Sequence, residues 1–183
     1  KSVEPKSGFA MNEFWIEFDE VNPVRVELFY GNFIVGMRNV LIDIESECLH
    51  DGTYECLKNV DLSDYDGGEI SYYFVVEDRV GQTGESHHYE IEVDTTFPEV
   101  ISISHVLKGT KADVIVEIAE TNFDGMSYIN FAESNPTEKS FCSSLKNGAC
   151  KKTLTLKTRL NVLQFQLNDE AGNSVSENYE INI

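Results

Sequence analysis

Carboxylates crowd one short stretch of the chain, residues 61–69. Asp61, Asp64, Asp66 and Glu69 lie here around two adjacent glycines. Carboxylate oxygens on a flexible loop are the hard ligands that calcium prefers. The stretch lacks the twelve-residue ligand pattern of an EF-hand. It therefore fits two interpretations, a calcium site and a solvated acidic turn, and calcium is the one cofactor that the sequence suggests.

The four cysteines form two pairs with the same spacing, Cys48-x7-Cys56 and Cys142-x7-Cys150. Structural zinc sites place two to four residues between paired cysteines, so this wider spacing argues against a four-thiolate site. An even number in equal pairs is typical of disulfides in an exported protein. Because turn-forming residues lie inside each pair, we expect each bond to clip a hairpin or loop between neighbouring strands and not to link two sheets. The chain-entropy estimate limits each bond to about 2.5 kcal/mol.

The remaining residue types that catalyse reactions do not form a recognisable set. His87 and His88 are adjacent on an expected strand, so their side chains point to opposite faces and cannot chelate one ion together. The chain has no nucleophile elbow, no phosphate loop and no HExxH motif. We therefore predict a protein that is not an enzyme and has no catalytic residues.

The net charge of this 183-residue chain is -18, and the acidity is uneven. Residues 1–97 contain 21 acidic and 6 basic side chains, whereas residues 98–183 contain 11 and 8. This balance excludes nucleic acid as a partner, because phosphate binding requires a basic face. No apolar run approaches the roughly 20 residues that a membrane helix requires, so we expect no membrane insertion. From the start at Lys1 we expect a processed or excised chain.

The two halves repeat the same features in the same order. In each half a cysteine pair precedes an alternating strand, an Asp-x-x-Gly turn and a closing Tyr-Glu-Ile strand. The turns and closing strands are residues 78–81 and 89–93 in the first half, and residues 169–172 and 179–183 in the second. Asp78 and Asp169 begin their turns, where we expect each carboxylate to bond the turn backbone.

Apolar side chains alternate with polar ones along many short segments, which is the period of a half-buried strand. Phe14, Ile16 and Phe18 share one face of the first clear strand, and we also expect the large ring of Trp15 in the core. About seven such segments fall in each half, and no segment has convincing helical periodicity. The sequence therefore predicts an all-β chain of two tandem immunoglobulin-like β-sandwich domains.

The junction between the halves is Asp94-Thr-Thr-Phe-Pro98, where Pro98 cannot donate to a strand ladder. We place the domains at residues 1–97 and 98–183 and expect them to be joined end to end. Residues 1–13, with the apolar Val3, Phe9 and Met11, precede the first clear strand. They predict either a free strand that pairs with the sheet edge of a neighbouring molecule or a frayed tail.

The Asp-Glu-Ala-Gly-Asn turn at residues 169–173, the strand that follows it and the junction at residues 94–98 resemble the tandem immunoglobulin-like repeats of prokaryotic, notably archaeal, cell-surface proteins. The turn of the first half departs from the pattern, since it reads Asp78-Arg-Val-Gly81-Gln. The resemblance implies an extracellular, non-enzymatic structural protein, a subunit or segment of a filament, surface layer or stalk. Its partners would be other copies or other surface proteins. The alternative is an adhesive or ligand-binding surface module whose acidic first domain meets a cationic or calcium-bridged partner.

Overall fold

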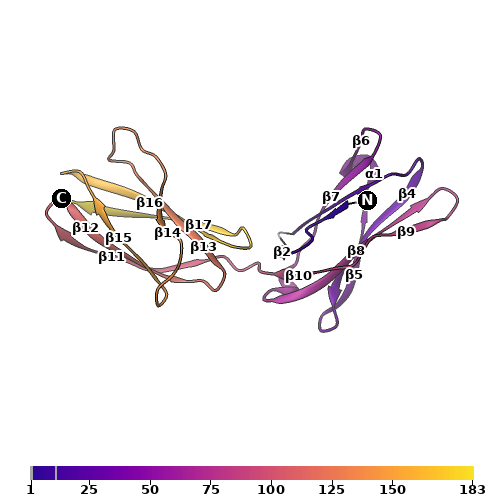
Figure 1. Cartoon of the computed structure of the whole chain (residues 1–183), viewed down its shortest axis with the longest axis horizontal. Coiled ribbons are helices and arrows are strands. Elements are labelled where there is room, and N and C mark those ends of the chain that lie inside the picture. Colours follow the sequence, from indigo (N-terminus) through magenta and orange to yellow (C-terminus); the bar gives the residue numbers. More distant parts are fainter. Residues whose placement is uncertain (1, 11) are drawn as a thin grey trace. The chain divides into compact units, whose positions relative to one another are not determined.

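The computed structural model describes residues 2–10 and 12–183. The chain divides into two compact units, Lys1–Thr95 and Thr96–Ile183, which we call unit 1 and unit 2. Each unit consists of two sheets, and nearly all of its regular structure is strand (Figure 1). In the described part of the chain, no helix has the length and apolar character needed to span a membrane.

Unit 1 contains a four-stranded and a six-stranded sheet. The four-stranded sheet has the spatial order β1 (Ser2–Glu4), β3 (Glu13–Phe18), β7 (Tyr54–Asn59) and β6 (Cys48–His50). The six-stranded sheet has the order β2 (Phe9–Ala10), β10 (Tyr89–Val93), β8 (Gly68–Asp78), β4 (Pro23–Asn32) and β5 (Gly36–Ile42), and β9 (Thr83–Glu85) also pairs with β8. The helix α1 (Ile44–Glu47) follows β5, and the 3-10 helix η1 (Ser63–Tyr65) precedes β8.

The core of unit 1 comes from the inward-facing positions of its strands. Phe14, Ile16 and Phe18 are buried in alternation along β3, as predicted. The rings of Phe14 and Tyr72 meet edge to face with 4.8 Å between their centroids, and burying such a ring contributes about 1.5–3 kcal/mol. The prediction for Trp15 is wrong. Because successive residues of a strand point to opposite faces, Trp15 lies on the outer face of β3 and is only partly buried.

The N-terminal segment is part of unit 1, where the sequence predicted a free segment. Val3 is buried and pairs with Ile16 of β3, and Phe9 pairs in parallel with Glu92 of β10. The hydroxyl of Tyr72 donates to the carbonyl of Pro5 at 2.5 Å. The segment therefore completes an edge of each sheet in its own domain. Met11, the third apolar residue predicted for a donor strand, lies outside the described residues.

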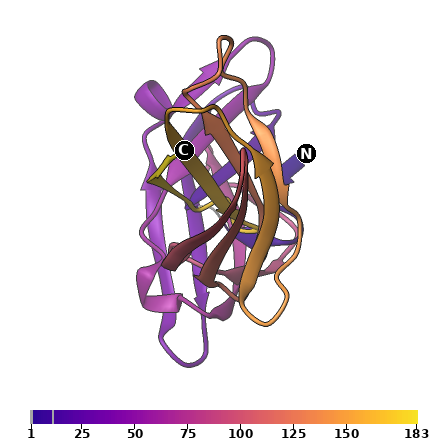
Figure 2. The ribbon, with the colours of Figure 1, turned by 90° about the vertical axis from the view of Figure 1, so that its left-hand side faces the viewer.

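Unit 2 contains a three-stranded and a four-stranded sheet. The three-stranded sheet has the order β11 (Glu99–Lys108), β12 (Lys111–Ala119) and β15 (Ala149–Thr155). The four-stranded sheet has the order β14 (Lys139–Cys142), β13 (Phe123–Asn130), β16 (Leu160–Asp169) and β17 (Ser174–Asn182). The antiparallel strands β11 and β12 run side by side (Figure 2). Leu163, Phe165 and Leu167 are buried in alternation along β16 and face the core, as the period of two predicts.

Both predicted disulfides are present, but they join different kinds of strand pairs. Cys48 of β6 and Cys56 of β7 are direct partners in one antiparallel ladder. Cys142 lies on the edge strand β14 of one sheet and Cys150 on the edge strand β15 of the other. The second bond therefore links the two sheets of unit 2, which corrects the expectation that both bonds clip neighbouring strands. The reason is that the turn at residues 143–148 carries the chain from one sheet to the other.

Candidate functional site

The acidic stretch at residues 61–69 has structural partners inside unit 1. One carboxylate oxygen of Asp61 accepts from the backbone nitrogen of Ser63 at 2.9 Å, and this bond lowers the pKa of Asp61. Asp64 forms an ion pair with Arg38 at 2.6 Å. Asp66 accepts from the backbone nitrogen of Thr95 at 2.5 Å.

The fourth member of the predicted calcium set, Glu69, lies on β8, and its backbone carbonyl accepts from the side chain of Asn32. Among the described residues, no three of these four carboxylates bring their oxygens close enough to share one ion. A calcium ion at this loop stays a prediction, which calorimetry with calcium chloride tests. The carboxylates of Asp61, Asp64 and Asp66 instead bond the backbone of Ser63, the side chain of Arg38 and the backbone of Thr95, respectively.

The two turn carboxylates do what the sequence predicts. Asp78 accepts from the backbone nitrogens of Val80 and Gln82 at 2.9 and 2.8 Å. Asp169 accepts from the backbone nitrogen of Asn173 at 2.8 Å. These bonds confirm that both carboxylates stabilise their turns.

The hairpin formed by β4 and β5 exposes the most prominent apolar group of unit 1. Its three-residue loop, which we call the tip, consists of Phe33, Ile34 and Val35. Phe33 is 96% exposed and Ile34 is 77% exposed. Large apolar side chains that gather on a surface commonly mark an interaction site. The sequence contains a signal for the tip, since three apolar residues stand between the turn formers Asn32 and Gly36. Strand periodicity alone does not reveal it.

Polar contacts at its base hold the tip in one conformation. The side-chain oxygen of Asn32 accepts from the backbone nitrogens of Ile34 and Val35 at 3.0 and 2.9 Å. Its amide nitrogen donates to the carbonyl of Glu69 on β8 at 2.9 Å. The hydroxyl of the buried Tyr65 donates to the carbonyl of Gly36 at 3.0 Å. The tip is thus anchored to β8 and to η1, and its backbone has little conformational freedom to lose on binding.

The backbone beneath the tip requires glycine. Gly31 has a φ of +142°, which L side chains rarely adopt. A Cβ at this position would lie 2.2 Å from the carbonyl oxygen of Gly36. The two strands therefore approach too closely for any side chain, and this approach permits the short loop.

A hollow of about 620 Å³ adjoins the tip. Its lining includes the apolar residues Phe33, Ile34 and Met37 and the acidic residues Glu69 and Glu90. An apolar surface bordered by carboxylates favours a partner with apolar and basic side chains.

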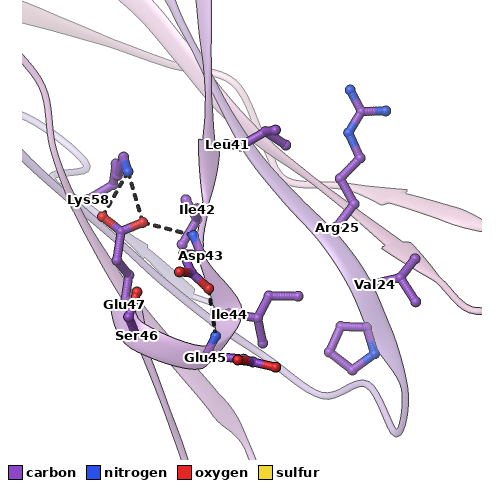
Figure 3. A pocket seen from close by; sticks show the side chains of 11 residues that line it. Val24, Arg25, Leu41, Ile42, Asp43, Ile44, Glu45, Ser46, Glu47 and Lys58 are labelled. Carbon is purple, nitrogen blue, oxygen red and sulfur yellow. Dashed lines mark hydrogen bonds and ion pairs between the residues drawn. The ribbon is translucent and has the colours of Figure 1, made fainter.

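A second hollow of about 780 Å³ lies where β5 enters α1 (Figure 3). On one side Glu47 pairs with Lys58 at 2.7 Å and accepts from the backbone nitrogen of Asp43 at 2.8 Å. The bond from Lys58 lowers the pKa of the Glu47 carboxyl. Leu41, Ile44 and Val24 lie on the side away from this pair (Figure 3). A hollow thus lies at each end of β5.

Unit 2 has the corresponding hairpin, β13–β14, with a different loop. Both hairpins begin with the same pattern, Tyr30-Gly-Asn-Phe33 and Tyr128-Ile-Asn-Phe131. Residues 131–138 then form a longer and mostly polar loop, in which Glu133 pairs with Lys139 at 2.7 Å. The apolar tip is therefore a property of unit 1 and not of the shared scaffold.

No protein-family model matches the chain, and no curated protein matches it. The chicken CNTN1 FN1-FN3 domains match the whole chain with a TM-score of 0.54 and 14% identity, and the chain spans 66% of the length of that structure. The Clostridium thermocellum CbhA fibronectin(III)-like modules match with a TM-score of 0.48 and 11% identity, over 100% of this chain and 93% of theirs. A two-domain fibronectin type-III segment from chicken tenascin matches with a TM-score of 0.42 and 10% identity, over 100% and 97%. The first match confirms the predicted fold class, tandem domains of the fibronectin type III and immunoglobulin-like kind, and at this identity it shows the fold alone.

Proposed function

We propose that this chain is an extracellular, non-enzymatic adhesive module, and that the tip of unit 1 makes the contact with its partner. The observation that carries the proposal is the exposure of Phe33 and Ile34 on a loop held rigid by Asn32. Burying the two side chains against a partner would contribute about 3–6 kcal/mol. Because the loop backbone is already ordered, the entropy lost on binding would come from the two side chains and from association itself.

The acidic charge of the chain favours a partner with a basic surface. The net charge of the chain is -18, and carboxylates of Glu69 and Glu90 border the hollow beside the tip. Such a field raises the rate of encounter with a cationic partner and repels acidic ones. The two disulfides support an extracellular location, because such bonds persist in oxidising compartments.

The experiment measures binding of the purified chain to an envelope preparation of the source cells. The double variant Phe33→Ser/Ile34→Ser should bind at least about tenfold more weakly than the wild type, since it loses the apolar contact. The matched control is Phe131→Ser/Leu160→Ser, which removes two apolar side chains of unit 2 that are about half exposed. Equal binding by wild type and tip variant, with unchanged circular dichroism melting, would overturn the proposal.

The second candidate is a structural subunit or segment of a filament, surface layer or stalk. The tandem repeat of one fold favours it, together with the resemblance to prokaryotic surface repeats at residues 94–98 and 169–173. Sedimentation velocity and negative-stain microscopy separate the two candidates. Polymers of the wild type that the tip variant still forms would favour the structural role, whereas a monomer that binds a partner favours adhesion.

A further inference from the structure

One strand of unit 1 has a long open edge. β5 contains seven residues and, in the described part of the chain, pairs only with β4. The other strands of unit 1 that end a sheet or lie beside it are β1, β2, β6 and β9, and each contains two or three residues. An edge strand presents unpaired backbone donors and acceptors, and proteins normally shorten, charge or cover such edges.

The equivalent edge in unit 2 is protected in the usual ways. β14 contains four residues, begins at Lys139 and ends at Cys142, which is bonded to β15 of the facing sheet. A short strand, a lysine and a covalent link all oppose the addition of another strand. β5 is longer and contains no lysine, proline or cysteine, and its one charged side chain, Arg38, is paired with Asp64.

The outer face of β5 offers apolar contacts along its length. Met37 is 52% exposed and Leu41 is 58% exposed. Asn39 lies between them and donates to the buried carboxylate of Glu27 at 2.8 Å, which holds this part of the hairpin in place. A strand of seven residues spans roughly 23 Å. The hollow beside the tip contacts Met37, and the hollow beside α1 contacts Leu41, so side chains at both ends of an added strand have room.

The charged residues near β5 favour the binding of a basic segment. The nearby cations are already paired: Arg38 with Asp64, Arg25 with Glu27, and Lys58 with Glu47. Glu45, Glu69 and Glu90 line the two hollows and form no ion pair among the described residues. A second copy of the chain would bring its own carboxylates against these, so the acidic balance disfavours self-pairing.

We propose that the open edge of β5 accepts an extended, basic segment of a partner protein as an additional strand. Main-chain bonds to β5 supply affinity, and alternate side chains of the segment contact Met37 and Leu41 and reach the two hollows. Basic side chains of the segment pair with the free carboxylates at its ends. The main-chain bonds of this site do not involve the tip, because Phe33 and Ile34 lie outside β5, although both residues line the hollow beside Met37.

The test begins with a displayed library of random twelve-residue peptides selected on the full chain. The strongest binder is synthesised unmodified and as two isomers, each methylated at a different alternate set of backbone nitrogens. If the peptide adds a strand, only one set of its nitrogens faces β5, so one isomer should lose at least about tenfold in affinity and the other should not. If both isomers keep the affinity of the unmodified peptide, or if both lose it, the proposal is overturned.

Variants of the chain then locate the site by calorimetry. Met37→Lys/Leu41→Lys should weaken the peptide at least about tenfold, because lysines repel a basic segment and remove its apolar contacts. The matched control is Ile101→Lys/Val106→Lys on β11, which adds the same charge at exposed apolar positions of an edge strand in unit 2 and should leave affinity unchanged.

Three outcomes would contradict this assignment. The first is a selected peptide with no excess of lysine and arginine. The second is a peptide whose binding is lost in Phe33→Ser/Ile34→Ser and kept in the β5 variant, which assigns it to the tip. The third is dimerisation of the wild type that the β5 variant abolishes, which makes a second copy the occupant. The sequence of the selected peptide decides the first outcome, calorimetry with each variant decides the second, and sedimentation velocity decides the third. Circular dichroism melting shows that each variant is folded.

Discussion

The hairpins β4–β5 and β13–β14 use one local pattern to present two different surfaces. Both turn after a Tyr-x-Asn-Phe sequence, and in both the asparagine side chain accepts from the backbone nitrogen two residues later. In unit 1 the chain returns after three apolar residues, whereas in unit 2 it returns after a mostly polar loop of eight. The asparagine therefore supports the turn, and the residues after it decide what the turn can contact.

The disulfides give a second comparison between the units. The same spacing of cysteines yields a bond inside one sheet in unit 1 and a bond between two sheets in unit 2. In unit 2 the bond also ties β14 to the facing sheet, whereas β5 of unit 1 contains no cysteine and lies at an open edge. Unit 1 thus combines the acidity, the apolar tip and the open edge, and it is the unit in which we place binding.

The largest effect should follow from a side chain at Gly31. Gly31→Ala places a Cβ against the carbonyl of Gly36 at a φ that disfavours L residues. We expect it to destabilise unit 1 by about 3 kcal/mol or more. Urea unfolding followed by the fluorescence of Trp15, the only tryptophan in the chain, measures this effect.

The matched control for that variant is Gly52→Ala. Gly52 also has a positive φ, +83°, but a Cβ there would meet nothing within 4 Å. Gly52→Ala should lower the free energy of unfolding by only about 1 kcal/mol, because only the backbone angle is strained. Equal losses for the two variants would show that the close approach of β4 and β5 is not what requires glycine at the base of the tip.

Removal of a disulfide should have the second-largest effect on stability. Cys48→Ser/Cys56→Ser and Cys142→Ser/Cys150→Ser each remove a bond that closes a loop of the same length. The chain-entropy estimate gives about 2.5 kcal/mol for each. Hydrogen exchange measured by mass spectrometry reports the two units separately. A much larger loss for the unit 2 pair would show that linking two sheets stabilises more than loop length predicts.

Tyr72 tests how unit 1 retains its N-terminal segment. Tyr72→Phe removes the bond to Pro5 and should cost about 1 kcal/mol at neutral pH. Burial raises the pKa of Tyr72 above its ordinary value of 10. The neutral hydroxyl therefore stabilises the fold below about pH 10, and this stability is lost as pH rises from there toward the folded-state pKa.

The Tyr72→Phe variant has no hydroxyl to ionise and so does not lose this stability. Its free energy of unfolding should therefore approach that of the wild type above pH 10. Trp15 fluorescence in urea at several pH values measures the difference from the wild type. A deficit that stays constant up to pH 11 would contradict the role assigned to the buried hydroxyl. Hydrogen exchange in unit 2 should be the same in the wild type and in Tyr72→Phe, and it serves as the internal reference.

The smallest effect on stability should come from the tip itself. Phe33→Ser/Ile34→Ser replaces exposed side chains, so the free energy of unfolding should change by less than about 0.5 kcal/mol. Binding of a neutral hydrophobic dye should nevertheless fall, and it should fall less for Phe131→Ser/Leu160→Ser. A loss of stability above about 1 kcal/mol would mean that the tip supports the fold, which would weaken its assignment to binding.

Local patterns in the sequence predicted much of this architecture. The alternation at Phe14, Ile16 and Phe18 assigned the inner face of β3 correctly, because the period of a strand depends only on the backbone. The turn roles of Asp78 and Asp169 were equally predictable, since each carboxylate bonds nitrogens within four residues of itself. The fold class followed from the number and spacing of such segments.

Contacts between distant segments were not predictable in this way. The N-terminal strands pack in unit 1 because Val3 pairs with Ile16 and the carbonyl of Pro5 accepts from Tyr72, which lies 67 residues further along the chain. The role of the second disulfide depends on whether a turn stays within a sheet or crosses to the other. The carboxylates at residues 61–69 were grouped by sequence, but their partners Arg38 and Thr95 come from other parts of unit 1.

The sequence by itself therefore determined the strands, their turns, the cysteine pairs and the acidity of the first half, because each depends on neighbouring residues or on composition. Only the tertiary structure decided that β5 lies at a sheet edge and which apolar residues face solvent. An apolar residue is buried only if another element covers it, and none of the described elements of unit 1 covers Phe33 and Ile34. The surface on which our proposals rest is thus set by the packing of strands that are distant in sequence.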